Sequence, residues 1–345
     1  MPSRPEPSLA SPGEAIEQRF IPQFKGYGAD MKRSLFQLAT TGAMFVAMLV
    51  AIGVVGRYYY WLALLMAIPT AGLLVRLFII QHDCGHGSFF RSRAANDFLG
   101  RIISVLTLTP YAEWKKGHAA HHASNGDLDR RGWGDVEMLT VREYQALTPM
   151  KQLGYRLYRN PLIMVLIGAP LNFIVLQRLP IGRTLKDRDA LRSVLSLNAV
   201  LLVVFGLPMV IFGAGPVLST YLPVMIMASW AGNWLFYVQH QFEDAYWEQH
   251  DDWNFQAAAL KGSSYFDLPP ILQWFSGNIG LHHVHHLCSR IPNYRLQAFL
   301  DSAPELRSSA RRITLFESLK CWRLSVWDEQ SRRLVRFSDL KARHA

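Results

Sequence analysis

Long apolar runs alternate with polar, basic segments along the 345-residue chain. Four of these runs approach the roughly 20 residues that an α-helix needs to cross the hydrocarbon core of a bilayer. They cover residues 35–56, 62–80, 194–212 and 216–238. The first two are separated by Arg57 and an aromatic cluster typical of the membrane interface, and the last two by Gly213-Ala214-Gly215. The pattern therefore predicts two transmembrane helical hairpins.

Two weaker apolar runs cover residues 98–111 and 161–176. The first is too short to span a bilayer, and the second contains Gly168, Pro170 and Asn172. We expect both to form interfacial or re-entrant helices. The alternative makes residues 161–176 a true span, which would put the two ends of the chain on opposite sides of the membrane.

The distribution of basic residues decides between four and five spans. Of the 36 lysines and arginines, 5 precede residue 35, 16 lie in residues 81–193 and 13 follow residue 238. The turns predicted to be external carry only Arg57. Because cytoplasmic loops carry the excess of Lys and Arg, four spans with both termini in the cytoplasm fit best.

The predicted fold class is therefore an all-α integral membrane protein. It has four transmembrane helices in two hairpins, interfacial helices and a cytoplasmic helical cap. We expect a single domain over residues 1–345, in which residues 1–30 form a flexible tail.

The polar, Pro-rich start predicts no cleaved signal peptide. The net charge of +10 is spread along the chain without a nucleic-acid-binding motif, so basic membrane flanks explain it better.

Eight of the twelve histidines fall into three short clusters on the predicted cytoplasmic side. They are His82, His86, His118, His121, His122, His282, His285 and His286. Residues three and four apart share one face of a helix, so each cluster can present a patch of imidazoles. Eight candidates exceed the four ligands of one tetrahedral zinc and indicate two metal ions. Imidazole binds zinc, copper, iron and nickel, so these ligands do not choose the metal.

Four other histidines are placed differently. His240 follows the last span on the same side as the clusters, so it is a ninth candidate ligand, with a hydrogen-bonding role as the alternative. His283 lies on a different helical face from His282 and His286, and we leave it outside the metal site. His250 and His344 have polar surroundings typical of surface residues.

The histidine clusters and the sequence that flanks them resemble a known protein family. Five stretches are especially similar: residues 82–90, 125–135, 155–161, 277–286 and 291–295. The ordered set resembles the membrane fatty acid desaturases, and most closely their bacterial acyl-lipid branch, over about residues 30–340. The extra His283 departs from the family pattern.

The resemblance implies an oxidoreductase that uses O2 to introduce a cis double bond into a lipid-linked acyl chain. It implies a cofactor of two iron ions, held by the eight clustered histidines and His240. It also implies an electron donor such as ferredoxin and a place in the bacterial inner membrane, with the metal site in the cytoplasm.

The chemistry of such a substrate agrees with that family. A saturated methylene has no acidic proton, so oxygen activated at a metal must remove its hydrogen. The sequence has no flavin, nicotinamide or haem motif and no cluster of four cysteines, so electrons must come from another protein.

Residues near the clusters can support the metal ligands or the substrate. Candidates for orienting the imidazoles are Asp83, Asp127, Asp135, Glu243, Asp244, Asn125 and Asn278. Trp114 and the aromatics in residues 234–237 either line an acyl channel or pack at the interface. Arg130 and Arg131 either contact a headgroup or redox partner, or simply follow the positive-inside rule.

Two other functions compete with desaturation. A related membrane di-iron hydroxylase or ketolase, acting on an alkane, sterol or carotenoid, would use the same spans and metals. A divalent-metal transporter would need polar ligands in the middle of its spans, whereas these clusters follow the spans.

Overall fold

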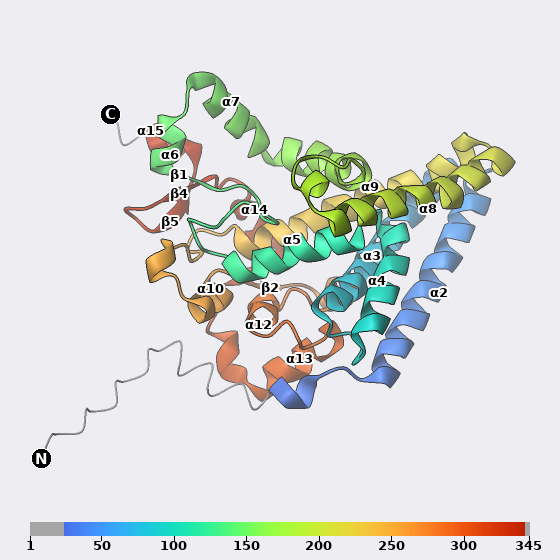
Figure 1. Ribbon diagram of the computed structural model, residues 1–345, viewed down its shortest axis with the longest axis horizontal. Helices are drawn as coiled ribbons and strands as arrows, with labels where there is room; N and C mark the ends of the chain where they lie inside the picture. The colour runs from blue at the N-terminus through green and yellow to red at the C-terminus, as the bar shows by residue number, and fades with distance from the viewer. Residues whose placement is uncertain (1–23, 342–345) are drawn as a thin grey trace, which may run out of the picture.

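The computed structural model describes residues 24–341, which are mostly helical. Most of the predicted N-terminal tail (residues 1–23) and His344 lie outside this range. Four long helices form the apolar body of the molecule (Figure 1): α2 (Met31–Val55), α3 (Tyr60–His86), α8 (Arg188–Phe212) and α9 (Ala214–His240). They cover the four predicted spans, except Gly56 after the end of α2, and each begins before its predicted span. The extra turns matter because α3 and α9 each end on a histidine.

Local sequence sets the ends of these helices. The Asp30 carboxylate caps α2 by accepting the Arg33 backbone N–H, and the Asp187 carboxylate caps α8 in the same way. Gly87 caps the C-terminus of α3 directly after His86, and its φ of 68° suits glycine far better than other residues. Gly213, with φ of 87°, makes the tight turn between α8 and α9.

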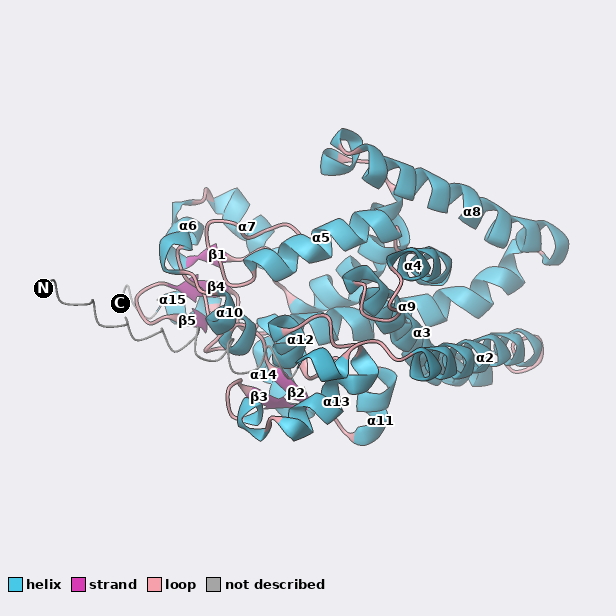
Figure 2. Cartoon of the chain, turned by 60° about the horizontal axis from the view of Figure 1, so that its bottom comes forward, coloured by secondary structure: helices cyan, strands magenta, loops and turns pink. Residues whose placement is uncertain are grey.

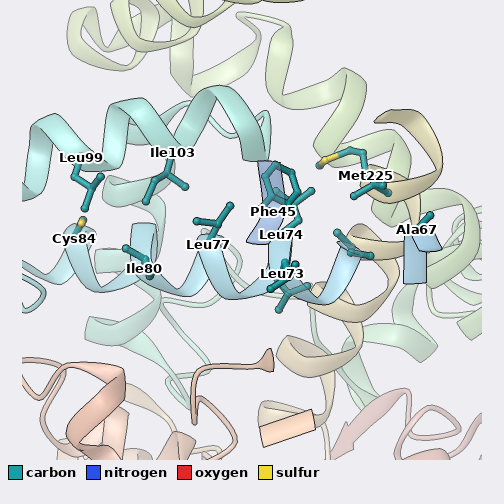
Figure 3. Packing of buried hydrophobic residues seen from close by; sticks show 14 of the residues in the cluster. Phe45, Ala67, Leu73, Leu74, Leu77, Ile80, Cys84, Leu99, Ile103 and Met225 are labelled. Carbon is teal, nitrogen blue, oxygen red and sulfur yellow. The ribbon is translucent and has the colours of Figure 1, made fainter. Parts of the chain in front are cut away.

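Helix α3 lies at the centre and packs against α2, α9 and α4 (Arg93–Thr107). Its buried alanines, Ala63, Ala67 and Ala71, recur every four residues and let neighbouring helices approach closely. Larger side chains fill the space around them, including Phe45 and Met225 from the adjoining helices (Figure 3). The packing holds the end of α3 in a fixed position.

Apolar side chains also cover the outside of the long helices. Phe36 is 73% exposed, Leu202 75% and Val210 85%. A soluble protein rarely exposes apolar patches of this extent, whereas lipid tails are their natural surroundings. Five helices are long and apolar enough to cross a membrane, and the fifth covers residues 162–186. The chain is thus an integral membrane protein, and the four-span count stays a prediction.

The fifth apolar segment is irregular. It consists of π-helical turns η2 (Leu162–Gly168) and η3 (Leu171–Val175), followed by 3-10 turns η4 (Leu176–Arg178) and η5 (Gly182–Lys186). Its two ends meet the part of the molecule that carries the histidines. Arg159 donates to Gln241 at 2.8 Å, and Asp187 accepts from Lys116 at 2.6 Å. Between them, the Leu166 carbonyl accepts from the Trp230 indole at 3.2 Å.

Most of the remaining elements form a cap beyond the ends of α3 and α9 (Figures 1 and 2). The other helices are α5 (Tyr111–Ser124), α6 (Val141–Ala146), α7 (Pro149–Tyr158), α10 (Phe255–Lys261), α11 (Pro270–Phe275), α12 (His282–Leu287), α13 (Asn293–Ser302), α14 (Leu315–Cys321) and α15 (Phe337–Lys341). Three 3-10 turns are η1 (Lys25–Tyr27), η6 (His250–Asp252) and η7 (Pro304–Arg307).

Two small sheets were not predicted. In the first, β4 (Val326–Asp328) pairs in parallel with β1 (Leu139–Thr140) and antiparallel with β5 (Arg333–Val335). In the second, β2 (Tyr265–Asp267) pairs in parallel with β3 (Arg312–Thr314). These short strands tie distant cap segments together, and the all-α prediction holds for the membrane part.

Candidate metal centre

Four helices bring nine histidines together. The end of α3 carries His82 and His86, and α9 ends on His240. The other six come from α5 and α12, whose histidine rings contact one another. All nine candidate ligands named from the sequence are therefore in one region.

The nine histidines divide into two groups. The five-histidine group consists of His82, His86, His118, His122 and His285, and the four-histidine group of His121, His240, His282 and His286. Within each group, the candidate ligand atoms lie within 4.8 Å of one another. The groups adjoin, because the rings of His122 and His286 stack with centroids 4.0 Å apart.

Helical spacing explains the division. In α5, His118 and His122 are four residues apart and belong to the five-histidine group, while His121 belongs to the four-histidine group. In α12, His282 and His286 are four residues apart and belong to the four-histidine group, while His285 belongs to the five-histidine group. Each His-x-x-His-His segment therefore contributes to both groups. The segment in α5 gives two histidines to the five-histidine group, and the segment in α12 gives two to the four-histidine group.

The ring nitrogens converge closely. In the five-histidine group, Nε2 of His118 lies 3.0 Å from Nε2 of His86 and 3.2 Å from that of His122. In the four-histidine group, Nε2 of His240 lies 2.9 Å from that of His282. Nitrogens about 2.1 Å from a shared ion would be about this far apart.

The hydrogen bonds of the outer ring nitrogens fix the tautomers of three histidines. Nδ1 of His82 faces the Asp83 carboxylate at 3.2 Å, and Nδ1 of His240 faces the Gly262 carbonyl at 3.0 Å. Nδ1 of His121 bonds to Asp135. A neutral imidazole has one donor nitrogen, so in all three the Nε2 lone pair points inward. Converging lone pairs need a cation, and the donor set therefore fits metal ions.

Burial keeps the imidazoles neutral. It is the main cause that holds the pKa of His118, His122, His282, His285 and His286 well below 6.5, and neighbouring histidines add to the effect. Neutral imidazole is the form that binds metals. The two groups differ in access, because His86 and His122 are half-buried whereas the four-histidine group is buried throughout.

Asp83 is held by a buried network behind His82. Its second oxygen accepts hydrogen bonds from the backbone N–H of Asn293 at 2.7 Å and from the Asn293 amide at 2.8 Å. The Asn293 side chain accepts in turn from Gln37 at 2.8 Å. This network links α2, α3 and α13 and leaves one carboxylate oxygen for the histidine. Asn293 lies in a segment that carried the family resemblance, yet its role was not predicted.

Asp135 is placed by a glycine loop that lies on α5. Gly134 has φ of 84°, and a Cβ there would lie 2.4 Å from the Gly117 carbonyl oxygen. A residue with a side chain would push the loop away from the helix. Gly134 therefore allows the next residue to reach His121.

The other candidate orienting residues lie elsewhere. Asp127 is fully buried but pairs with His250, at 2.8 Å. Glu243 pairs with Arg333 on the surface, and Asp244 is exposed. The Asn125 amide donates to the Gly262 carbonyl that also faces His240, at 3.4 Å. Asn278, with φ of 60°, donates to the Asn293 carbonyl instead.

Aromatic rings flank both groups. Trp114 stacks on His118 with centroids 4.8 Å apart, and Phe236 lies 5.2 Å from His121. A Cβ on Gly85 would lie 2.8 Å from the Trp114 ring, so this glycine lets the indole reach its place. These contacts put Trp114 beside the five-histidine group and leave its acyl-channel role a prediction.

Arg130, Arg131 and His283 each contact neighbouring residues of the chain, which leaves the headgroup or redox-partner role of the two arginines a prediction. Arg130 bonds to His250 at 2.6 Å, and Arg131 bonds to Glu143 and to the Leu128 carbonyl. His283 belongs to neither group and packs against Tyr265, with burial lowering its pKa to about 4. Its separation from the groups agrees with the prediction.

Comparison with known proteins gives a consistent family. The chain matches the fatty acid desaturase family over residues 59–312. It is 39% identical to a "Fatty acid desaturase" of Bacillus subtilis, over 90% of this chain and 88% of the relative. It is 26% identical to an "sn-1 oleoyl-lipid 12-desaturase" of Synechocystis sp., over 72% of this chain and 70% of the relative. An "sn-1 acyl-lipid omega-3 desaturase (ferredoxin)" of the same organism is 28% identical over 64% and 61%.

Proposed function

Because the chain belongs to the fatty acid desaturase family, we propose that it is an O2-dependent desaturase with two histidine-bound irons. It introduces a cis double bond into a lipid-linked acyl chain. Family membership makes the protein an oxidoreductase that desaturates fatty acyl chains. The finer parts of the proposal are the metal, its ligands, the acyl carrier and the electron donor.

The observation that carries the proposal is the division of nine buried or half-buried histidines into groups of five and four. Two donor sets that adjoin fit two ions better than one. Zinc has no redox chemistry, while imidazole also suits iron. Bound iron would supply the activation of oxygen that removal of two methylene hydrogens requires.

The protein's own residues hold and orient the metal ligands. Asp83, Asp135 and the Gly262 carbonyl accept from the outer nitrogens of three histidines and so keep the inner nitrogens unprotonated. Their negative or partial negative charge also makes the rings stronger ligands. Phe236 and the buried surroundings of the four-histidine group exclude water from the centre.

Four spans with both termini in the cytoplasm remain our proposed topology, in one domain. Support comes from the irregular segment between residues 162 and 186, because Arg159 and Asp187 at its ends both contact the metal end of the molecule. Its contact with Trp230 lies ten residues before His240, about 15 Å along α9. A segment that enters and returns on one side fits these contacts. A bacterial inner membrane would then have the metal centre on its cytoplasmic face.

The acyl substrate is proposed to be a membrane lipid, and the electron donor a small acidic protein such as a ferredoxin. Relatives named as acyl-lipid desaturases, one of them with ferredoxin in its name, support both. The half-buried His86 and His122 mark the side that a donor can approach most closely. Electrostatic attraction predicts that activity with an acidic donor falls as salt rises. Activity indifferent to salt and to donor charge would reject this part.

A hydroxylase or ketolase with the same metals is the alternative, and the names of the relatives do not favour it. Fatty acid profiling after expression in a host without the enzyme separates the two. We expect a new unsaturated acyl chain rather than an alcohol or ketone.

Single changes of His86 or His121 to Ala should abolish the product. His250→Ala is the matched control, because this histidine is outside both groups. Retained desaturation after loss of His86 or His121 would overturn the site assignment.

A further inference from the structure

A second feature of the molecule lies away from the histidines, on the outer side of α2. An open groove of about 470 Å³ runs along one face of this helix. The lining residues from α2 recur at helical spacing: Arg33, Phe36, Gln37, Thr40 and Met44. They extend over 12 residues, or about 16 Å, and change from cationic near the histidine groups to apolar further into the bundle.

Arg76 forms the opposite wall, and it is a charged residue within the long helix α3. Its Nε donates to the Thr41 hydroxyl at 3.3 Å, and one terminal nitrogen donates to the Trp274 carbonyl. The guanidinium also lies over the Trp274 ring, 4.3 Å from its centroid. The other terminal nitrogen has no hydrogen-bond partner within residues 24–341. Charges within membrane helices are costly and usually serve a function.

Helix α11 places the groove at the level of the membrane interface. It exposes Ile271 (65%) and Leu272 (38%), apolar side chains that a lipid surface would cover. Trp274, at its end, is a residue type that favours the interface. The two guanidinium groups of the groove therefore lie where phospholipid headgroups are found.

The charged residues that line the groove are all cationic. No carboxylate lines it, and the nearest acidic neighbour of Arg33 is Asp30, which lies outside the groove. On the other side of the first turn of α2, a second cleft of about 450 Å³ contains Lys32, Arg91 and Arg295. Its single carboxylate, Asp30, already pairs with Arg295 at 3.1 Å. An anion is favoured here over a zwitterion, whose ammonium group would meet the same cations.

We propose that this groove binds one anionic glycerophospholipid, with its phosphate beside Arg33 and Arg76 and an acyl chain along Phe36 and Met44. The inference goes beyond the proposed function, because it holds whichever lipid is desaturated. Gln37 lines the groove and also bonds to Asn293, which holds Asp83 behind His82. A lipid bound here would therefore touch the buried network that supports the metal centre.

The test is a binding measurement on the purified full chain in detergent. Phosphatidylglycerol is titrated, and bound lipid is counted by native mass spectrometry. One phosphatidylglycerol should bind tightly to the wild type, and phosphatidylcholine should bind more weakly. Arg33→Ala removes one interfacial cation and should weaken binding about fivefold. Thr40→Trp fills the groove without changing its charge and should abolish tight binding.

Arg57→Ala is the matched control. It removes an exposed arginine at the opposite end of the α2–α3 hairpin, so phosphatidylglycerol affinity should not change. Equal losses from Arg33→Ala and Arg57→Ala would show non-specific attraction and overturn the proposal. Unchanged binding by Arg33→Ala, or displacement of the lipid by excess inorganic phosphate, would also overturn it. The assay contains no O2-dependent step, so a failure of the desaturase proposal would leave its result unaffected.

Discussion

Asp135 offers the sharpest test of how the metal ligands are supported. It bonds to Nδ1 of His121, a fully buried member of the four-histidine group. Asp135→Asn keeps the shape and an oxygen that can accept the same hydrogen bond, but it removes the negative charge. Asp135→Ala removes the hydrogen bond as well.

The expected losses follow from the strength of this support. Removing a partner of a metal-bound histidine typically costs 10–100-fold in metal affinity or activity, which is about 1.4–2.8 kcal/mol. Charge-assisted hydrogen bonds are roughly twice as strong as neutral ones. We therefore expect about a tenfold loss for Asp135→Asn and about a hundredfold loss for Asp135→Ala.

The assay measures iron bound per chain at limiting iron, together with the fatty acid profile of expressing cells. The four-histidine group should lose its ion first, because His121 belongs to it. Asp127→Asn is the control, since Asp127 is a carboxylate paired with His250, outside both groups, and is more deeply buried than Asp135. It should keep wild-type iron content. Full iron content and activity in Asp135→Ala, or equal losses in the control, would refute the reasoning.

Three further predictions concern stability, the loop and topology. Burial holds the pKa of five histidines on α5 and α12 well below 6.5, so the stability they contribute is complete above that pH and is lost as pH falls. The unfolding free energy of metal-free protein should therefore decrease as pH falls below about 6.5, seen as a falling Tm; a flat Tm would contradict this. Gly134→Ala should displace Asp135 and reduce iron content, whereas Gly154→Ala, in α7, where a Cβ would meet nothing within 4 Å, should keep it; equal iron content would argue against the loop's role. Reporter fusions should place both termini in the cytoplasm, and termini on opposite sides would establish an odd number of spans.

The membrane helices were predictable from the sequence, but their ends were not. Apolar runs marked the four long helices α2, α3, α8 and α9, because side chains that face lipid must be apolar. Helix α3 continues past its predicted span for the six residues 81–86 and α9 for the two residues 239–240, and a hydropathy pattern carries no signal for such an extension. The short strands were missed for a related reason. Tyr265 pairs with Arg312, far away in sequence, and three-residue strands carry little local preference.

The histidines themselves were predictable from spacing, whereas their division was not. Which group a ring joins depends on how α5 and α12 face each other, which is a tertiary property. The same holds for the supporting residues. Of the carboxylates near the clusters, Asp83 and Asp135 contact histidines of the two groups, while Asp127 contacts His250. The Gly262 carbonyl could not be predicted, because every residue has one and only the fold decides which faces His240.

Iron content is the most direct measure of the central proposal that these nine histidines bind a pair of iron ions. The full chain, purified anaerobically after expression with iron, should contain two irons per chain. His285→Ala, which affects only the five-histidine group, should reduce this number while the four-histidine group keeps its ion. A single ion per chain, a preference for zinc, or an iron content unchanged by loss of His285 would contradict the account.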